Sequence, residues 1–535
     1  MKGVKLRPYQ QEAADAVVAR FVAGEKSTLV VMPTGTGKTV LFAAIIDRVD
    51  EWKPGGRILV MAHREELIRQ AAQKIHAVTG HESDIEMAGE RADVSMFHRS
   101  RVVVASKDTL RGNRLKRFKP EEFGLIITDE AHHAIADTYV NVYTHFKDVP
   151  HLGVTATPDR TDEEKLGSVY QSVAFDYELP DAIRDGWLCP IRQRSIEIKS
   201  LDYSHVHTTA GDLNGRELAE VLGNEKVLQQ QADATLSESR GRKTLVFATP
   251  GFKRQGETQF RVSERLTEIF NRHRHGIARL VTGETPKEER QQTLRDYKDG
   301  LFQILVNVGV FTEGFDDPSI ELVVMTRATK SRSLYAQIVG RGTRPLPGIV
   351  DGVESPEGRR AAIAASAKPW CEVLDFEGNA GTHKLIHVTD ILGDKYTPAE
   401  LELANRIVKK SKGSVDVHNA LDAARGEIKL RDAKERFRRA WIVGKAKWDT
   451  KEIDPFNHYD VDRRFRQSSG GAAGPTDKQI KWLKRFGVKI GPEMTRAQAS
   501  AILGRKFDEK KNAGRPRLNA NKVAQKMGWK TGGAA

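Results

Sequence analysis

Residues 29–46 constrain the fold of this chain more than any other stretch. Residues 29–31 form an apolar run typical of a buried strand. The chain then turns through Gly35 and Gly37 and continues into the apolar helical segment 40–46. A strand that passes through glycines directly into a helix is a unit of parallel α/β sheets, so the sequence predicts an α/β fold.

The same turn has the composition of a phosphate-binding loop. Its glycines let backbone N–H groups close around phosphate oxygens, and the new helix directs the positive end of its dipole at them. We expect Lys38 to reach the β- and γ-phosphates of ATP, and the Thr39 hydroxyl to face Mg²⁺. Met32 stands where the general pattern has its first glycine. The predicted nucleotide-binding residues of the loop are Thr34, Gly35, Thr36, Gly37, Lys38 and Thr39.

A second apolar strand, 125–128, ends in two adjacent carboxylates, Asp129 and Glu130. At the tip of a strand, Asp129 would hold the Mg²⁺ shell. Glu130 would orient and deprotonate the water that attacks the γ-phosphate.

These motifs resemble those of superfamily 2 helicases of the DEAH type. Asp129 to His132 resembles motif II, and this adds His132 to the predicted catalytic residues. Residues 152–158 resemble motif III, in which Thr155 and Thr157 would couple hydrolysis to nucleic-acid binding. The resemblance implies two tandem RecA-like parallel-sheet lobes with ATP between them, followed here by a helical, basic C-terminal region.

Motifs of a second lobe follow in the family's order. The strand and turn 243–250 resemble motif IV, which would bring Thr249 to the nucleic acid. Residues 309–316 resemble motif V. There Gly314 and Asp316 would face the nucleotide, and Thr312 would face the nucleic-acid backbone.

Residues 335–344 resemble motif VI and carry two arginines, Arg341 and Arg344. Three residues apart, they share a helix face or its continuing turn. From across the cleft they would stabilise the charge of the transferring γ-phosphoryl group. Gln337 in the same segment is a predicted coupling residue.

Polar residues elsewhere in the first half are weaker candidates. Gln10 could read an adenine edge because its amide both donates and accepts, or be an ordinary exposed amide. Arg64, Ser106 and Thr109 follow strands at the edge where open α/β sheets bind ligands, which favours phosphodiester contacts. The alternative is that Ser106 caps a helix and Arg64 is solvated.

The charge of the chain is concentrated at its C-terminal end. Residues 401–535 hold 32 Lys and Arg against 15 Asp and Glu, a net of +17, which leaves −3 for residues 1–400 out of the total of +14. A near-neutral body with a basic tail indicates a polyanionic partner, nucleic acid. The alternative is a solvated basic surface that only aids solubility.

The C-terminal region divides at the linker 468–475. Residues 475–535 contain 15 basic and 4 acidic residues and two capping-box sequences, which predict a small helical DNA-binding module. Arg515 and Arg517 lie in a Gly-Arg-Pro-Arg segment that resembles the core of an AT-hook. The match covers only four residues, so a basic loop between helices is the favoured interpretation of this segment.

The predicted organisation is lobe 1, connector, lobe 2, helical extension and basic module, at residues 1–195, 196–240, 241–395, 396–467 and 475–535. No apolar run is long enough to span a membrane. Two cysteines among 535 residues indicate a reducing cytoplasm, and we expect a bacterial or phage source.

The resemblance implies an ATP-dependent DNA helicase or translocase that unwinds DNA or migrates branches. Its cofactors would be ATP and Mg²⁺. Its partners would be single-stranded, branched or duplex DNA and proteins of replication, recombination or defence. Motifs V and VI are unlike those of DEAD-box RNA helicases and similar to the DNA-directed branch. Three alternatives stay open: an RNA helicase, the motor subunit of a restriction or defence complex, and an ATP-gated DNA clamp.

Overall fold

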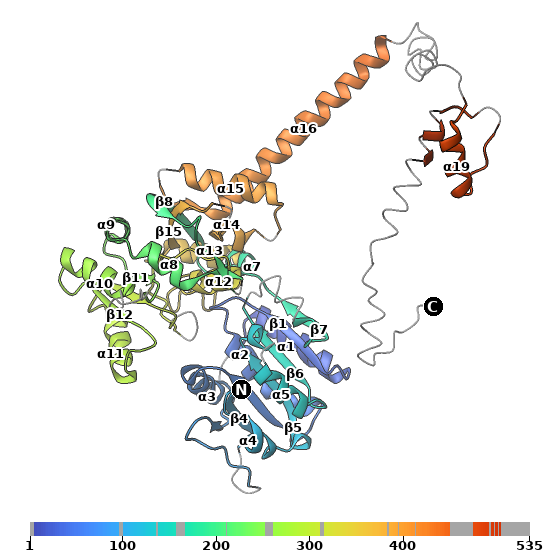
Figure 1. Ribbon diagram of the computed structural model, residues 1–535. Coiled ribbons are helices and arrows are strands. Elements are labelled where there is room, and N and C mark those ends of the chain that lie inside the picture. Colours follow the sequence, from blue (N-terminus) through green and yellow to red (C-terminus); the bar gives the residue numbers. More distant parts are fainter. Residues whose placement is uncertain are drawn as a thin grey trace, which may run out of the picture. The chain divides into compact units, whose positions relative to one another are not determined.

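The structure is a computed structural model of the 535-residue chain. The chain forms two compact units, Met1–Lys429 and Leu430–Ala535, and the first unit contains two sheet-based lobes (Figure 1). The described residues are 5–95, 100–134, 137–156, 166–209, 211–251, 261–310, 315–381, 385–393, 395–411, 413–449, 474–491, 494–496, 498–500 and 502–503.

The first lobe is built on a seven-stranded, wholly parallel sheet with the order β3-β4-β2-β5-β6-β1-β7. Its strands are β1 (Ser27–Val31), β2 (Arg57–Ala62), β3 (Ser83–Glu86), β4 (Val102–Ser106), β5 (Phe123–Asp129), β6 (His151–Thr155) and β7 (Ser172–Asp176). The helices of this lobe are α1 (Pro8–Val22), α2 (Lys38–Ile46), α3 (Glu65–Thr79), α4 (Gly112–Lys116), α5 (Asp137–His145) and α7 (Leu179–Arg184).

Alternation along the strands explains why helices cover both faces of this sheet. In β2, Ile58 and Val60 pack with α1, α2 and α3, whereas Leu59 and Met61 pack with α4 and α5. Successive side chains of a strand point to opposite faces, so a strand that is apolar throughout is buried on both sides. The predicted α/β fold is therefore confirmed, and the glycine turn lies between β1 and α2.

The second lobe has its own seven-stranded sheet, with the order β12-β13-β11-β14-β15-β8-β16, in which only β16 is antiparallel to its neighbour among the described strands. Its strands are β8 (Ile191–Asp202), β11 (Thr244–Phe247), β12 (Ala278–Val281), β13 (Ile304–Asn307), β14 (Leu322–Met325), β15 (Cys371–Asn379) and β16 (Val415–Asp416). Its helices are α8 (Gly215–Leu222), α9 (Glu225–Ser239), α10 (Val262–His273), α11 (Lys287–Lys298), α12 (Arg332–Gly340), α13 (Pro356–Ala365), α14 (Val388–Leu392) and α15 (Pro398–Lys410). A short hairpin, β9 (Thr208–Thr209) with β10 (Asp212–Leu213), follows β8.

The second lobe begins earlier than the sequence predicted. Residues 191–195 were expected to end lobe 1 and 196–240 to form a connector, but β8 pairs with β15 in the second sheet. Leu218 of α8 and Leu228 of α9 pack in the core of that lobe. Apolar and polar residues alternate in part of β8, which is typical of a strand. Its partner, however, is determined by backbone pairing with β15, which such a pattern does not encode.

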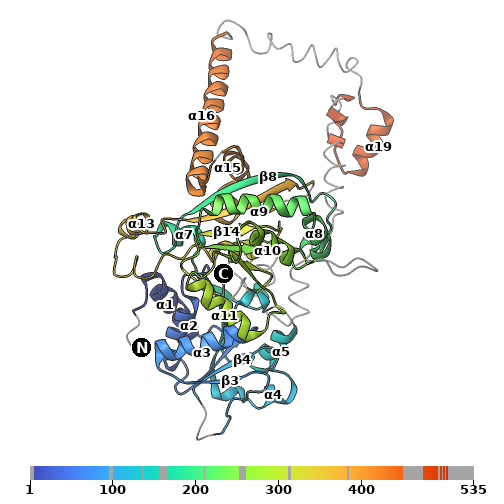
Figure 2. The ribbon, with the colours of Figure 1, turned by 90° about the vertical axis from the view of Figure 1, so that its left-hand side faces the viewer.

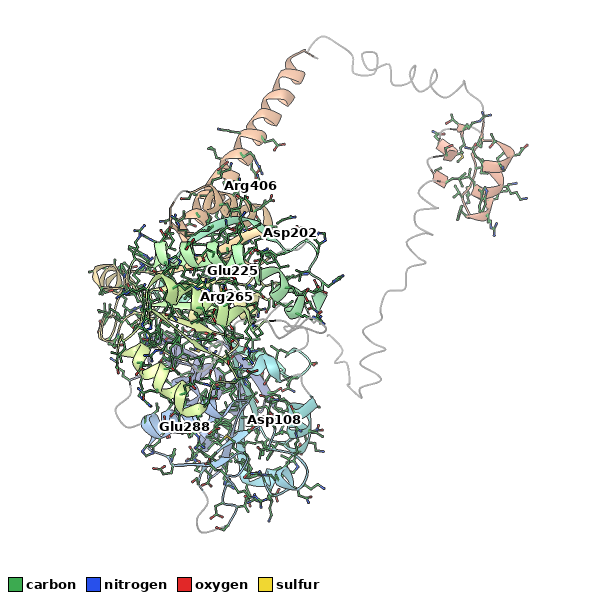
Figure 3. The ribbon with its side chains drawn as sticks, turned by 60° about the vertical axis from the view of Figure 1, so that its left-hand side comes forward. Asp108, Asp202, Glu225, Arg265, Glu288 and Arg406 are labelled. Atoms are coloured by element: carbon green, nitrogen blue, oxygen red, sulfur yellow. The ribbon has the colours of Figure 1, made fainter. Side chains whose placement is uncertain are left out.

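Ion pairs on the surface join neighbouring helices of this lobe. Arg265 of α10 pairs with Glu225 of α9 at 2.6 Å, and Figure 3 shows the two labelled side chains close together. Both cysteines, Cys189 and Cys371, are buried and unbonded to each other. Among the described helices, none combines the length and the apolar character that crossing a bilayer requires.

The second unit contains a small helical core. Helix α16 (Val417–Asp449) runs across the boundary between the units, and α19 (Asp477–Arg485) follows later in the chain. Both predicted capping boxes are present, with Thr476 bonded to Gln479 and Thr495 to Gln498. Leu483, Ala499 and Leu503 form the core of this unit.

Candidate nucleotide-binding site

The phosphate loop is held in place by two side chains of α1. The Tyr9 hydroxyl donates to the Thr36 carbonyl at 2.7 Å, and Gln10 Nε2 donates to the same oxygen at 2.8 Å. Burial raises the pKa of Tyr9, which keeps its hydroxyl protonated as a donor. Gly35 and Gly37 have φ angles of 90° and 85°, a region that favours glycine, so these residues allow the tight turn before α2.

Gln10 is more engaged within the protein than the sequence suggested. Its Oε1 accepts from the backbone N–H of Arg7 at 3.0 Å while its Nε2 holds Thr36, although the residue also lines the cavity described below. Its proposed contact with an adenine edge stays a prediction.

The predicted carboxylates stand opposite the loop lysine. Asp129 ends β5, and the following Glu130 has a left-handed backbone with φ of 51°. Lys38 Nζ lies 3.2 Å from Glu130 Oε1, and His132 Nδ1 lies 3.5 Å from Glu130 Oε2. His132 Nδ1 is also 3.1 Å from the Thr155 hydroxyl at the end of β6. A continuous polar chain therefore links the loop, the carboxylate pair and the end of β6.

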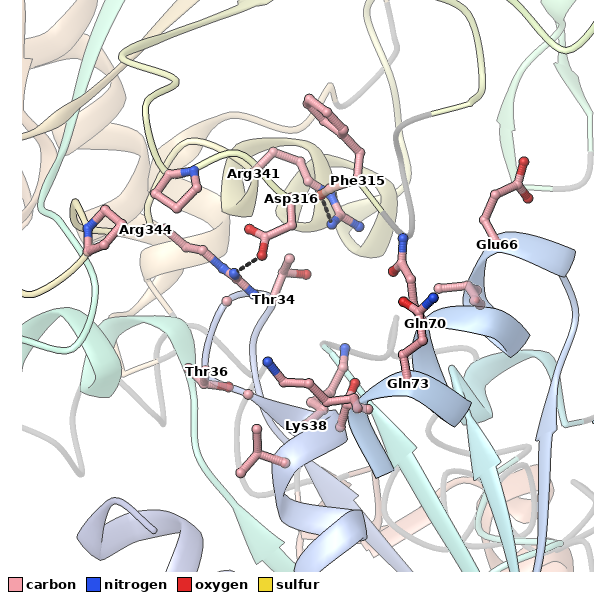
Figure 4. Close-up of a pocket in the computed structure, with 18 of the residues that line it drawn as sticks. Thr34, Thr36, Lys38, Glu66, Gln70, Gln73, Phe315, Asp316, Arg341 and Arg344 are labelled. Carbon is pink, nitrogen blue, oxygen red and sulfur yellow. Dashed lines mark hydrogen bonds and ion pairs between the residues drawn. The ribbon is translucent and has the colours of Figure 1, made fainter. Parts of the chain in front are cut away.

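The second lobe brings its two arginines to the same place. Arg344 pairs with Asp316, and Arg341 Nη1 donates to the Phe315 carbonyl at 2.6 Å (Figure 4). A Cβ atom added at Gly35 would lie 3.1 Å from Arg344 Cγ, so the Arg344 side chain touches the phosphate loop.

Motif VI and the loop are also in close contact at Gly340. A Cβ atom added there would lie 2.9 Å from Thr34 Cβ, closer than such atoms ordinarily approach. The glycine at the end of α12 therefore allows the two lobes to meet directly.

These residues line one cavity of about 890 Å³ between the lobes. Thr39 and Asp129 both face it, and their hydroxyl and carboxylate oxygens are ligands that suit Mg²⁺ together with phosphate oxygens. The predicted residues that line the cavity are Gln10, Thr34, Gly35, Thr36, Gly37, Lys38, Thr39, Arg64, Asp129, Glu130, Asp316, Arg341 and Arg344.

Arg7 and Trp187 also line the cavity, although no sequence motif indicated them. The guanidinium groups of Arg7 and Arg359 lie 4.5 and 3.9 Å from the centre of the Trp187 ring. Arg7 also lies 3.7 Å from Asp351 of the second lobe. Arg7, Trp187 and Arg359 are each more than 170 positions apart in the chain and form no motif, so the linear pattern held no signal for them.

The residues predicted to contact nucleic acid differ in their surroundings. Arg64 spans the two lobes, donating to the carbonyls of Gly309 and Val310 at 3.3 and 3.1 Å. The Ser106 hydroxyl accepts from the backbone N–H of Asp108 at 3.3 Å, which is a local contact. The Thr109 hydroxyl accepts from the backbone N–H of Ala88, 21 residues earlier in the chain, at 3.3 Å. The Thr249 hydroxyl is buried and has no hydrogen-bond partner within the described ranges.

The remaining predicted residues divide into two groups. Gln337 is buried in α12, and Thr155 is buried at the end of β6. Five lie outside the described residues: Thr157, Thr312, Gly314, Arg515 and Arg517.

Comparison with known families matches two stretches of the chain. Residues 3–160 match the family model described as "Type III restriction enzyme, res subunit", and residues 226–345 match "Helicase conserved C-terminal domain". The first covers the phosphate loop and both carboxylates, and the second covers both arginines. The chain therefore belongs to the superfamily 2 helicases. Its assignment to the DEAH type stays a prediction.

Individual relatives agree with this class. "Putative ATP-dependent helicase IRC3" of Saccharomyces cerevisiae is 33% identical over 414 residues, covering 74% of this chain and 55% of that protein. "DNA 3'-5' translocase XPB2" of Sulfurisphaera tokodaii is 24% identical, covering 63% and 78%. The chain spans about half the length of the yeast relative. We expected a bacterial or phage source from the sequence. Similarity to a yeast protein weighs against a purely bacterial or phage origin.

A solved structure supports the fold. A fragment of a "putative HsdR subunit of a type I restriction enzyme" from Vibrio vulnificus superposes with a TM-score of 0.51. The two are 23% identical, and the match covers 72% of this chain and 65% of that one. At this identity the likeness shows the two-lobe architecture alone.

Proposed function

We propose that this chain is a DNA-stimulated ATPase that couples ATP hydrolysis to movement on DNA or to its remodelling, by unwinding or branch migration. The observation that carries this proposal is the convergence of Lys38 and Glu130 of one lobe with Arg341 and Arg344 of the other on a single cavity. A nucleotide bound there would join the lobes, so its hydrolysis would change their relation.

The first lobe would prepare the attacking water. Lys38 would exchange Glu130 for the β- and γ-phosphates, and this leaves the Glu130 carboxylate to orient and deprotonate the water. Because His132 contacts both Glu130 and Thr155, a change in the position of this carboxylate would be transmitted to the end of β6. Mg²⁺, held by Thr39 and Asp129, would neutralise phosphate charge when bound.

The second lobe would stabilise the transferring group. Arg344 would exchange Asp316 for the γ-phosphoryl oxygens, and Arg341 would approach beside it. This interaction exists only while the lobes are closed, so hydrolysis would weaken closure. Alternation of closed and open lobes would then move the protein along one strand of nucleic acid.

DNA is the proposed polymer because the forms of motifs V and VI resemble the DNA-directed branch of the family. The similarity to a protein named as a DNA translocase supports the same choice. We further propose a cytoplasmic location and partners in replication, recombination or defence.

Substitution of Lys38 tests the nucleotide site. Lys38→Ala should abolish DNA-stimulated ATP hydrolysis, since the phosphates lose their main cation, while binding of DNA without nucleotide stays within about twofold of the unaltered chain. Lys119→Ala, which alters an exposed lysine of the same lobe, is the matched control and should hydrolyse ATP normally. Retained hydrolysis in Lys38→Ala would reject the site.

The choice of nucleic acid is tested by measuring ATPase rates with single-stranded, duplex and forked DNA and with RNA. Stronger stimulation by RNA would favour an RNA helicase. Tight DNA binding with almost no turnover would favour an ATP-gated clamp. Displacement of a triplex strand would separate translocation from unwinding of a fork.

A further inference from the structure

Lys368 is a charged side chain in the interior of the second lobe, and no motif includes it. It precedes β15 and is only 1% exposed. Its Nζ donates to the Pro318 carbonyl at 2.6 Å and to the Arg344 carbonyl at 2.7 Å. Burying an ammonium group is costly unless it is hydrogen-bonded, so these two carbonyls define what the side chain does there.

The two carbonyls belong to the two segments that face the nucleotide from the second lobe. Pro318 follows Asp316 by two residues, and both line the cavity. Arg344 supplies the side chain that reaches the phosphate loop. The side chains of Asp316 and Arg344 pair with each other, as Figure 4 shows. The backbones of the same two segments are joined a second time through Lys368.

We infer that Lys368 is a positioning residue that fixes the backbone of Arg344 against the turn at Pro318 and thereby sets the reach of the Arg344 guanidinium. This inference rests on the proposed function, in which Arg344 stabilises the transferring phosphoryl group. The Arg344 side chain already touches Gly35, so a displacement of its backbone would move the guanidinium relative to the phosphates. Displacements of about 1 Å can reduce a rate about a hundredfold.

The surroundings of Lys368 indicate that the residue acts on this junction. Thr343, next to Arg344, accepts a hydrogen bond from the backbone N–H of Cys189 at 2.7 Å. A Cβ atom at Gly342 would collide with Cys371, so the backbone there lies directly on β15. Three consecutive residues at the end of motif VI, Gly342, Thr343 and Arg344, therefore have close backbone contacts. Of the three contacts described here, the one at Arg344 is made by a charged side chain.

Lys368→Met in the full chain tests the inference, because methionine keeps most of the stem and removes the donors. We expect kcat for DNA-stimulated ATP hydrolysis to fall about 10- to 100-fold, while KM for ATP changes by less than about threefold. Arg242→Met is the matched control. It removes another lobe 2 cation, whose guanidinium pairs with Glu372 at 2.8 Å and otherwise donates to the carbonyls of Glu238 and Ser239. This control should lower thermal stability and leave kcat within about twofold.

A double-mutant cycle distinguishes positioning from loss of fold. In single-turnover measurements, Lys368→Met should have no more than about a twofold effect when Arg344 is already alanine, since the side chain that it positions is gone. An effect of equal size in both backgrounds would overturn the inference, as would a normal kcat in the single variant. Lys368→Arg, which keeps donors, should retain more activity than Lys368→Met, and failure of both variants to fold would assign a purely structural role and overturn it.

The failure of this inference and that of the proposed function are separable. If Arg344→Ala hydrolyses ATP at the normal rate, the proposed role of the arginine fails. If Arg344→Ala is inactive while Lys368→Met is fully active, only the role of Lys368 fails.

Discussion

His151 is a buried histidine at the start of β6 that makes the stability of the protein depend on pH. Its Nε2 hydrogen-bonds to the Phe146 carbonyl at 3.0 Å. The centre of its ring lies 4.8 Å from that of the Tyr143 ring, in an edge-to-face arrangement. Burial lowers its pKa to about 4, from 6.5 for an ordinary histidine. In the unfolded chain His151 is therefore protonated below about pH 6.5, whereas in the folded chain it stays neutral down to about pH 4.

Stability should consequently be lost as pH falls from 6.5 to 4, by up to about 3 kcal/mol from this residue. His151→Gln, which keeps a donor for Phe146, should make the fall in thermal stability over this window shallower than in the unaltered chain. The measurement is the midpoint of thermal unfolding of the full chain at closely spaced pH values. Parallel curves for the two proteins would contradict the assignment.

Among individual residues, the sequence indicated those that belong to local motifs but not those that are defined by contacts with distant parts of the chain. Lys38, Asp129 and Arg344 were predicted because each stands in a short run whose spacing carries its chemistry. Lys368 and Trp187 were not, because a buried lysine and a tryptophan at the cavity are defined by contacts far away in the chain. The Arg64 guanidinium donates to two carbonyls across the lobes, contacts that no local pattern indicates, and its expected contact with phosphates stays a prediction.

Two helices of different lobes, α3 and α11, are joined by charge. Glu65 and Glu66 in the first turn of α3 pair with Lys287 and Arg290 of α11 at 2.6 and 2.8 Å. Figures 1 and 2 show these helices side by side. The Lys287 ammonium, together with Arg69, holds the pKa of Glu65 below its usual value. Such exposed pairs contribute little to folding, so we expect these two pairs to act mainly on the approach of one lobe to the other.

Reversal of one charge should therefore change lobe closure more than folding. Arg290→Glu should shift the balance towards separated lobes by about two- to fivefold at low salt, and the added change Glu66→Arg should restore it. Energy transfer between dyes on the two lobes, at Lys119→Cys and Leu301→Cys, measures the balance, because the native cysteines are buried. An unrestored double variant would show that local contacts of Arg290 caused the effect.

Among elements, the strands of both sheets were the most predictable. The run at 29–31 and the strand before Asp129 are apolar throughout, as strands buried on both faces must be. The residues of β8 were divided between lobe 1 and the connector by the predicted boundaries, but β8 belongs to the second sheet. The alternation of β8 indicates that one face is buried, whereas membership of a sheet depends on pairing with β15, about 180 residues later.

For the whole molecule, the open question is what the second unit adds to the first. The exposed basic residues of its described part include Lys478, Lys481 and Lys484 on α19. Phosphate contacts raise affinity without reading sequence, and each contributes about −0.9 to the slope of log affinity against log salt.

Deletion of residues 475–535 should therefore weaken DNA binding and flatten its salt dependence, by about 3 in slope if three contacts are lost. Replacement of Lys478, Lys481 and Lys484 by glutamine is the matched variant, since it removes charge while it keeps the core around Leu483. Binding by fluorescence anisotropy across a salt series provides the slopes. An affinity equal to that of the full chain would exclude the second unit from DNA binding.

The left-handed backbone at Glu130 has a consequence for how this protein can evolve. Any residue with a side chain is held there at a disadvantage of about 1 kcal/mol or more, and glycine would relieve it. Yet glycine has no carboxylate, so in the proposed mechanism the substitution that relieves this backbone would also remove the group that deprotonates the attacking water. Selection for thermal stability and selection for ATP hydrolysis would thus oppose each other at this one residue. A more heat-stable variant of the protein would need its stabilising substitutions at other positions.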